Sequence, residues 1–422
     1  MSGPSGVNAL AQAAKEASRV LALAPAEIKN KALREMASAV RRHAAGILAE
    51  NRKEAGKSKA AGRTAAFIDR LSLDPRRLDD AAAGLERVAG LPDPVGEFSD
   101  FAIRPNGLVI RKMRVPLGVI AVIYEARPGV TADAAGLCLK SGNAAILRGG
   151  KEAIKTNAAI AGALAEGLKA CGLPAGCVGF IKDADRAAVR RLLGLEGLID
   201  LVIPRGGPEL TEMVRRESSI PVLAHEKGLC HTFVDASADP AMAEEICFNA
   251  KAERPGVCNA METLLVHAAI APLFLPPMAA RYRRAGVELR GCPLTRAILP
   301  ELRPAQEADW DAEYLDLILS IKVAGSFEEA VDHIARHGSG LAEAIVTGDA
   351  ALGERFQREV DAGAVYVNAS TRFTDGGEFG MGAEMGISTQ KLHARGPVGL
   401  AGLTCEKYVV TGQGQVRDSR TK

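Results

Sequence analysis

Residues 118–147 contain the strand-like run Gly118-Val-Ile-Ala-Val-Ile-Tyr124, a helical pattern from Val130 to Leu139, and the run Asn143-Ala-Ala-Ile-Leu147. Apolar runs of this kind are typical of strands buried on both faces, and a strand–helix–strand order favours a parallel sheet. The order continues with strands predicted at 178–181 and 198–203 and helices at 151–171, 186–193 and 209–216. This region therefore predicts a doubly wound α/β domain, a fold that binds nucleotides at the carboxyl ends of its strands.

The chain on either side of this region has its own patterns. Downstream, strands are predicted at 262–266, 287–289, 317–323, 343–346 and 364–367, with helices such as Phe327–Arg336 between them. Upstream, residues 8–95 repeat apolar side chains at three- and four-residue spacing, which predicts helices. The fold class is α/β, with two parallel-sheet domains.

A β-hairpin is predicted at 101–115, where Pro105-Asn106-Gly107 separates two strand-like runs. A two-stranded ribbon needs a covering surface to be stable in water. That surface is either a second subunit or the hairpin's own domain, and the pattern alone favours neither.

Composition excludes several classes of protein. The 422 residues carry 53 basic and 51 acidic side chains, so a net charge of +2 leaves no excess to neutralise nucleic acid. The sequence contains no run of about 18 apolar residues, so no membrane span is predicted, and the N-terminus lacks the pattern of a signal peptide. We expect a cytoplasmic protein whose eight cysteines, none in a Cys-x-x-Cys pair, stay reduced.

Cys258 is the strongest catalytic candidate, because it follows Pro255-Gly256 and precedes the strand predicted at 262–266. A thiol on irregular backbone between two ordered elements is accessible, and nearby N–H groups can stabilise its thiolate. The alternative is a cysteine that only packs in a core, which is common for this residue type.

Two glycine turns follow strands of the first α/β region, and neither is a Gly-x-Gly-x-x-Gly motif. Arg148-Gly149-Gly150-Lys151 and Arg205-Gly206-Gly207-Pro208 each place an arginine and two glycines before a predicted helix. Free N–H groups and a cation there suit a phosphate. Such turns also occur without any ligand.

Histidines give weaker signals. Cys230 and His231 are adjacent, and neighbours in a strand face opposite ways, so we expect a core cysteine and a histidine toward the surface. His333 and His337 are four residues apart on a predicted helix, but no third ligand is evident. No metal site is predicted.

Several segments together resemble one family. They are Ile123-Tyr-Glu-Ala-Arg-Pro-Gly-Val-Thr-Ala-Asp133, Ala145-Ile-Leu-Arg-Gly-Gly-Lys-Glu-Ala153, Asp200-Leu-Val-Ile-Pro-Arg-Gly-Gly207, Glu253-Arg-Pro-Gly-Val-Cys-Asn-Ala-Met-Glu-Thr-Leu264 and Glu313-Tyr-Leu-Asp316. With Asn368 and Phe379-Gly380, they resemble the aldehyde dehydrogenase superfamily, and more specifically its γ-glutamyl phosphate reductases.

The resemblance implies NADPH-dependent reduction of L-glutamyl 5-phosphate to L-glutamate 5-semialdehyde, the second step of proline biosynthesis from glutamate. Cys258 would be the nucleophile, and backbone N–H groups near Cys258 and Asn259 would stabilise the oxyanion. Arg127 and Arg254 would bind anionic groups of the substrate.

The resemblance also implies the cofactor site. NAD-using relatives hold the ribose with a Lys-Pro-x-Glu motif, which here reads Arg148-Gly149-Gly150-Lys151. Replacing the carboxylate by cations favours the 2′-phosphate of NADPH. The expected cofactor-binding residues are Arg148, Gly149, Gly150, Lys151, Arg205, Gly206, Gly207 and Glu313.

The implied organisation has three parts. Residues 1–100 and 116–227 would form an NADPH-binding domain, residues 228–382 a catalytic domain, and residues 101–115 with 400–422 an oligomerisation flap that includes a strand at 405–411. The expected assembly is a homodimer or homotetramer, with transient contact to glutamate 5-kinase.

Three other functions stay open. A hydrolytic NAD(P)-dependent aldehyde dehydrogenase acting on a small polar aldehyde needs a glutamate general base, and His225 occupies that position here, with Glu226 one residue away. A thiol acyltransferase would use Cys258 without a nicotinamide. A binding module without catalysis is the third.

Overall fold

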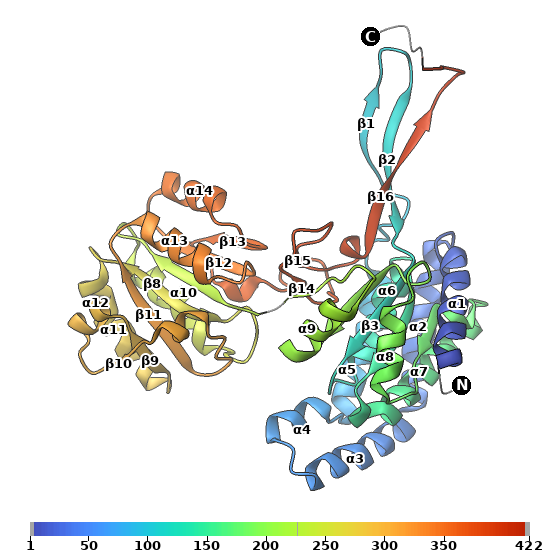
Figure 1. Ribbon diagram of the computed structural model, residues 1–422, viewed down its shortest axis with the longest axis horizontal. Helices are drawn as coiled ribbons and strands as arrows, with labels where there is room; N and C mark the ends of the chain where they lie inside the picture. Colours follow the sequence, from blue (N-terminus) through green and yellow to red (C-terminus); the bar gives the residue numbers. More distant parts are fainter. Residues whose placement is uncertain (1–3, 226, 418–422) are drawn as a thin grey trace. The chain divides into compact units, whose positions relative to one another are not determined.

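The computed structural model describes residues 4–225 and 227–417 (Figure 1). Contacts divide the chain into two compact units. The first consists of Met1–Leu223, Met381–Gly386 and Val398–Lys422, and the second of Ala224–Gly380 and Ile387–Pro397. Each unit contains its own parallel sheet, as the alternating patterns predicted.

The first unit begins with helices and continues with alternating elements. Its helices are α1 (Pro4–Leu21), α2 (Ala26–Arg42), α3 (Ala44–Ala60), α4 (Ala65–Leu71), α5 (Pro75–Gly90), α6 (Val130–Lys140), α7 (Ile154–Ala170), α8 (Arg186–Leu193) and α9 (Pro208–Glu217). Its strands are β1 (Phe98–Ile103), β2 (Val109–Pro116), β3 (Val119–Tyr124), β4 (Ala144–Gly149), β5 (Val178–Phe180), β6 (Leu201–Arg205) and β16 (Thr404–Thr411). Short 3₁₀ turns are η1 (Lys151–Ala153), η2 (Ala175–Cys177) and η5 (Ala401–Leu403).

The central sheet of the first unit has the strand order β5-β4-β3-β6, and every pair in it is parallel. All residues of β3 and β4 are buried, which explains why their sequences are apolar without alternation. The helix predicted at 151–171 begins later than expected, because η1 precedes α7.

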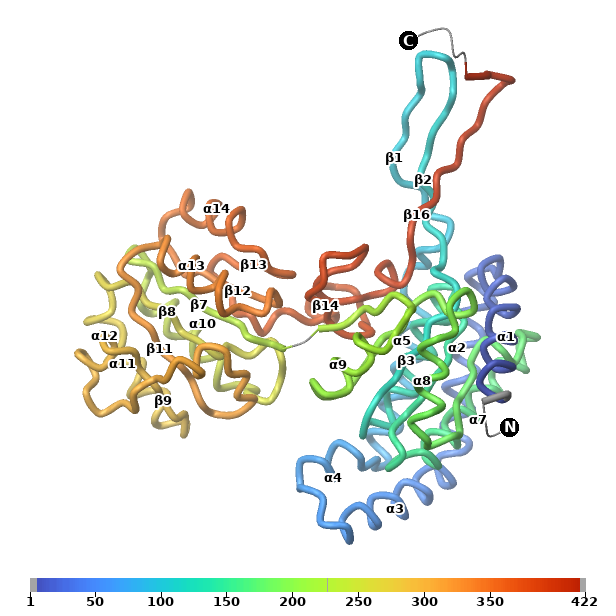
Figure 2. Tube along the Cα trace, viewed as in Figure 1, coloured from blue at the N-terminus to red at the C-terminus, as the bar shows by residue number. Residues whose placement is uncertain are grey.

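The predicted hairpin forms a three-stranded antiparallel sheet of order β1-β2-β16. Figure 2 shows β16, near the end of the chain, running beside β2. Gly107 in the turn has φ +86°, a conformation that favours glycine. Every residue of β1 is exposed, so the alternative of a hairpin packed on its own domain does not hold for this strand.

The second unit contains the remaining elements. Its helices are α10 (Pro240–Ala252), α11 (Ala271–Arg284), α12 (Pro293–Ile298), α13 (Phe327–His337) and α14 (Ala350–Glu359), with 3₁₀ turns η3 (Glu307–Asp311) and η4 (Thr371–Phe373). Its strands are β7 (Cys230–Val234), β8 (Met261–His267), β9 (Glu288–Gly291), β10 (Arg303–Pro304), β11 (Ile318–Ala324), β12 (Ala342–Val346), β13 (Ala364–Val367), β14 (Ile387–Ser388) and β15 (Gly396–Pro397).

Seven of these strands form a parallel sheet of order β10-β9-β11-β8-β7-β12-β13. Its two faces belong to different hydrophobic clusters: Leu264 packs with residues of α10 and α11, whereas Leu265 packs with residues of α13 and α14. Because helices cover both faces, the central strands β7 and β8 have no solvent side. Within the described residues, no helix is long and apolar enough to span a membrane.

Candidate active site

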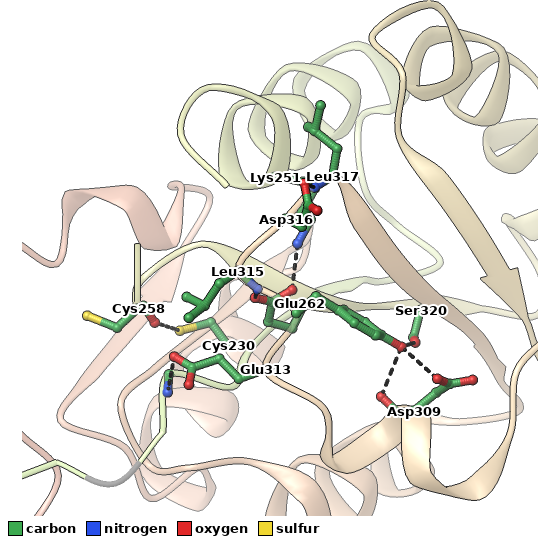
Figure 3. A network of polar contacts seen from close by, with 12 residues as sticks. Cys230, Lys251, Cys258, Glu262, Asp309, Glu313, Leu315, Asp316, Leu317 and Ser320 are labelled. Carbon is green, nitrogen blue, oxygen red and sulfur yellow. Dashed lines mark hydrogen bonds and ion pairs between the residues drawn. The ribbon is translucent and has the colours of Figure 1, made fainter. Parts of the chain in front are cut away.

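Cys258 lies on an irregular loop between α10 and β8, as the Pro255-Gly256 signal predicted. Its side chain is half-buried, and its carbonyl oxygen accepts a hydrogen bond from the Cys230 thiol, with a sulfur–oxygen distance of 3.4 Å. In Figure 3 the Cys258 sulfur points away from Cys230. The position suits a nucleophile, because the backbone is held while the thiol is directed elsewhere.

Asn259 fastens this loop to the η4 segment. Its side-chain Nδ2 donates to the carbonyl oxygen of Thr374 at 2.9 Å, and its backbone carbonyl accepts from the Thr371 hydroxyl at 2.8 Å. The Arg372 guanidinium donates to the other side-chain atom, Oδ1. The Asn259 amide group is therefore engaged, and any oxyanion contact from this residue has to come from its backbone N–H.

Gly228 packs directly on the backbone of Cys258. A Cβ atom at residue 228 would lie 2.5 Å from the Cys258 Cα, too close for any side chain. The Gly228 N–H donates to Oε1 of Glu313 at 2.9 Å. Burial raises the pKa of Glu313, while this hydrogen bond and Lys227 oppose the shift. The predicted cofactor contact Glu313 thus lies beside the Cys258 loop.

The expectation that His231 leans toward the surface is wrong. Its side chain is fully buried, and both its backbone N–H and Nδ1 contact Oε2 of Glu343, at 2.7 and 3.0 Å. Alternation exposes one side of a strand only where one face of the sheet is solvated, and β7 has helices on both faces. Cys230 is buried as expected, and burial raises its thiol pKa well above the ordinary value.

In the first unit, the turn after β4 does not offer an open helix N-terminus. The buried Glu54 of α3 accepts hydrogen bonds from the N–H groups of Lys155 and Thr156, at 2.9 and 3.0 Å. Two N–H groups in the first turn of α7 are therefore not free, because a carboxylate from a distant helix already caps that helix.

The two cations of this turn differ in exposure. Arg148 is buried and donates to the carbonyl oxygen of Ala184 at 3.0 Å, and burial lowers its pKa. Lys151 is exposed. Between them, Gly149 closes β4 and Gly150 precedes η1. Of the two cations, only Lys151 is placed to meet a ligand from solvent.

The turn after β6 has the predicted form: Arg205 ends the strand, Gly206 follows, and Gly207 caps α9 with Pro208 in its first turn. The Gly207 N–H donates to Oε2 of the exposed Glu125 at 3.0 Å. An exposed carboxylate on a helix N-terminus marks a position that another anion can take.

The predicted substrate arginines lie in different units. Arg127 is exposed in the turn after β3, next to Ala126, which has φ +39°. Arg254 is exposed on the Cys258 loop. Glu226, next to the position of the hydrolytic base, lies outside the described residues. Among the described residues, no group of three or more His, Cys, Asp or Glu has the arrangement of a metal site.

A family model described as "Aldehyde dehydrogenase family" matches residues 1–294. The chain belongs to the aldehyde dehydrogenase family. A curated relative from Caldanaerobacter subterraneus subsp. tengcongensis, named gamma-glutamyl phosphate reductase, is 54% identical over 97% of this chain and 99% of its own length. A protein of the same name from Carboxydothermus hydrogenoformans is 53% identical over 97% and 98%. Both place the chain among the gamma-glutamyl phosphate reductases of that family.

Solved structures agree with this aldehyde dehydrogenase fold. A gamma-glutamyl phosphate reductase from Thermotoga maritima has a TM-score of 0.96 and 47% identity, covering 98% of this chain and 100% of that one. A glyceraldehyde-3-phosphate dehydrogenase from Methanocaldococcus jannaschii, complexed with NADP, has a TM-score of 0.66 and 15% identity, covering 98% and 95%. The predicted family and fold class are confirmed.

Membership in the aldehyde dehydrogenase family makes the protein an oxidoreductase acting on an aldehyde, with a nicotinamide cofactor. Sequence reasoning identified the cysteine loop of this enzyme and its glycine turns but missed the residues that support them: Gly228, Glu54, Glu125 and the η4 segment. Gly228 stands two residues before β7, where a glycine gives no distinct signal.

Proposed function

We propose that the protein reduces L-glutamyl 5-phosphate to L-glutamate 5-semialdehyde and phosphate, using NADPH. Relatives named gamma-glutamyl phosphate reductase match nearly the whole chain and support this activity. The structural observation that carries it is the half-buried Cys258 thiol on a loop fastened by Asn259 and Gly228. A held backbone with an accessible thiol is what covalent catalysis requires.

The chemistry at Cys258 has three steps. The thiolate attacks the acyl carbon, and the carbon–oxygen bond to phosphate breaks, which leaves a thioester. The thioester carbonyl then accepts a hydride and becomes the oxyanion of a hemithioacetal. Collapse of this oxyanion breaks the carbon–sulfur bond, releases the aldehyde and restores the thiolate. Backbone N–H groups near Cys258 and Asn259 would stabilise the oxyanion.

The residues at the carboxyl edge of the first sheet fit a nicotinamide dinucleotide. The Gly207 N–H at the start of α9 holds a carboxylate, so its surroundings accept an anion, and Lys151 offers an exposed positive charge. The α7 N-terminus, capped by Glu54, does not take part. When bound, the cofactor supplies the hydride. Lys151 stands where NAD-using relatives carry a glutamate, and this replacement supports NADPH over NADH.

Among the described residues, two observations argue against deacylation by water. His225 stands where hydrolytic relatives carry their glutamate base, and the buried Glu262 is paired with Lys251. The homodimer or homotetramer, and a transient contact with glutamate 5-kinase, remain predictions that belong to the same proposal. The exposed β1-β2-β16 sheet supports the assembly.

A reverse assay tests the proposal. Purified protein is mixed with glutamate 5-semialdehyde and NADP⁺, with and without inorganic phosphate, and absorbance of NADPH is followed. We expect NADPH to form only with phosphate, because phosphate and not water resolves the thioester. Formation without phosphate would instead identify a hydrolytic aldehyde dehydrogenase, and no formation in either mixture would reject both.

A further inference from the structure

The two ends of the Cys258 loop are joined by a buried ion pair. Lys251 lies in the last turn of α10 and Glu262 is the second residue of β8, so the loop runs between them. Lys251 Nζ and Glu262 Oε2 are 2.5 Å apart, and both side chains are fully buried. The pair therefore closes the base of the loop that carries the thiol.

Stability alone is a weak explanation for this pair. Removing two charges from water costs about as much free energy as their attraction returns, and apolar side chains of equal volume serve as well or better. Burial raises the pKa of Glu262 to about 7 and lowers that of Lys251, while each partner's charge opposes the shift in the other. The role of the pair is then to orient the hydrogen bonds that its two side chains make.

The second carboxylate oxygen of Glu262 reaches another segment. Oε1 accepts a hydrogen bond from the backbone N–H of Leu315 at 3.1 Å. Leu315 has φ +52°, a left-handed conformation that is unfavourable for a residue with a Cβ atom. An unusual backbone of this kind persists only where its surroundings hold it. The hydrogen bond to Glu262 is one of the contacts that stabilise this backbone.

Leu315 stands two residues after Glu313, so the bond from Glu262 reaches the segment that carries Glu313 (Figure 3). Glu313 accepts from the Gly228 N–H, and Gly228 packs on the backbone of Cys258. The Glu262 carboxylate thus contacts Lys251 at the base of the Cys258 loop through one oxygen and the Glu313 segment through the other. All of these contacts lie within the second unit.

We infer that Lys251 and Glu262 are positioning residues, which set the Cys258 loop relative to the Glu313 segment through the hydrogen bond to Leu315. Lys251 fixes the Glu262 carboxylate, and Glu262 fixes both segments. The inference rests on the proposed function, in which Cys258 attacks the substrate and Glu313 contacts the cofactor.

Two double variants separate the effect of the buried charges from the effect of the hydrogen bond to Leu315. In Lys251→Met/Glu262→Gln the charges are gone but an oxygen for the Leu315 N–H remains. In Lys251→Met/Glu262→Met both the charges and the acceptor are gone. A matched control is Arg281→Met/Glu245→Gln, which removes a partly exposed pair that also involves α10. Melting temperatures show whether each variant is folded.

The readouts are the rate of Cys258 alkylation by iodoacetamide across pH, with the Cys258→Ser protein as background, and kcat and KM for the cofactor. We expect the Met/Met variant to lose up to about 100-fold in kcat with an altered alkylation profile, since small misplacements have effects of that size. The Met/Gln variant should recover most of the loss, and the control should resemble the unmodified protein.

Equal values for the Met/Met variant and the unmodified protein would overturn the inference. So would equal losses in both double variants that follow their melting temperatures, because a purely structural role has that signature. Alkylation needs no glutamyl substrate, so it still reads the position of Cys258 if the reductase assay fails.

Discussion

At the scale of the residue, the sulfur of Cys258 carries the proposed chemistry. Cys258→Ser should lower the reduction rate by at least about a thousandfold, because a hydroxyl is a far weaker nucleophile than a thiolate at neutral pH. NADPH affinity, measured by fluorescence titration, should stay roughly unchanged. Cys405→Ser on β16 is the control and should turn over normally. Comparable residual turnover in Cys258→Ser would exclude the covalent route.

Gly228 tests the support behind that thiol. Gly228→Ala should reduce kcat on the order of 100-fold, because the added methyl group overlaps the Cys258 backbone and displaces the loop. Gly256→Ala is the matched control within the loop itself: its Cβ would have Leu315 O at 3.7 Å as its nearest contact, an ordinary distance. Similar kinetics for the two variants would show that the close packing at residue 228 is irrelevant.

Lys151 tests the preference for NADPH. Lys151→Glu should weaken NADPH binding by roughly tenfold or more and change NADH binding little, because the new carboxylate repels only a 2′-phosphate. Dissociation constants for both cofactors give the comparison. Lys169→Glu, at the other end of α7, changes the charge equally and serves as the control. Equal losses for both cofactors would place the 2′-phosphate elsewhere.

At the scale of the element, the β1-β2-β16 sheet presents large apolar side chains to solvent. Phe98, Phe101, Ile103, Tyr408 and Val410 are each more than half exposed. Its outer strands also leave backbone groups unpaired in the sheet, which favours pairing with another chain. These features suit the predicted subunit contact.

Ending the chain after Leu403 removes β16 and should shift the mass in solution toward monomer, as measured by light scattering. A chain ended after Thr411 keeps β16 and should retain the mass of the full protein. Melting temperatures establish that both forms are folded. An unchanged mass in a folded chain without β16 would assign the assembly to another surface.

At the scale of the whole molecule, the predicted catalytic residue and the predicted glycine turns belong to different units. Cys258 and Glu313 belong to the second unit, and the turns at 148–151 and 205–207 to the first. The chain returns to the first unit for residues 398–422. The stability of the second unit has its own reporter, because Trp310 is the only tryptophan and its ring contacts His333, with centroids 5.3 Å apart.

His333 predicts how acid acts on that unit. Burial, with smaller effects from His231 and His337, lowers its pKa to about 2. Below about pH 6.5 this histidine is protonated in the unfolded chain but not in the folded chain. Its contribution to the free energy of unfolding is therefore complete above that pH, and it falls by up to about 1.4 kcal/mol per pH unit below it.

Urea unfolding followed by Trp310 fluorescence at pH 7.5 and 5.5 should show this loss, and His333→Leu should show a smaller one. The difference between the two proteins isolates the effect of His333 from that of the other ionisable groups in this unit. Equal acid losses in both would mean that His333 is protonated in the folded state.

The sequence by itself determined the alternation of strands and helices in the first α/β region, the two parallel sheets, the turn at Gly107 and the irregular setting of Cys258. These features depend on apolar periodicity and on glycine and proline, whose effects act within a few residues. The family resemblance added the chemistry, since its motifs are spread along the whole chain.

Only the tertiary structure decided which groups meet. Glu54 caps a helix 102 residues away, Asn259 is fastened by a carbonyl 115 residues away, and Glu262 holds Leu315 across 53 residues. Whether His231 is exposed depends on helices packed over both faces of its sheet. The physical reason is that burial and hydrogen-bond partners are set by contacts between distant segments, and local patterns carry no record of those contacts.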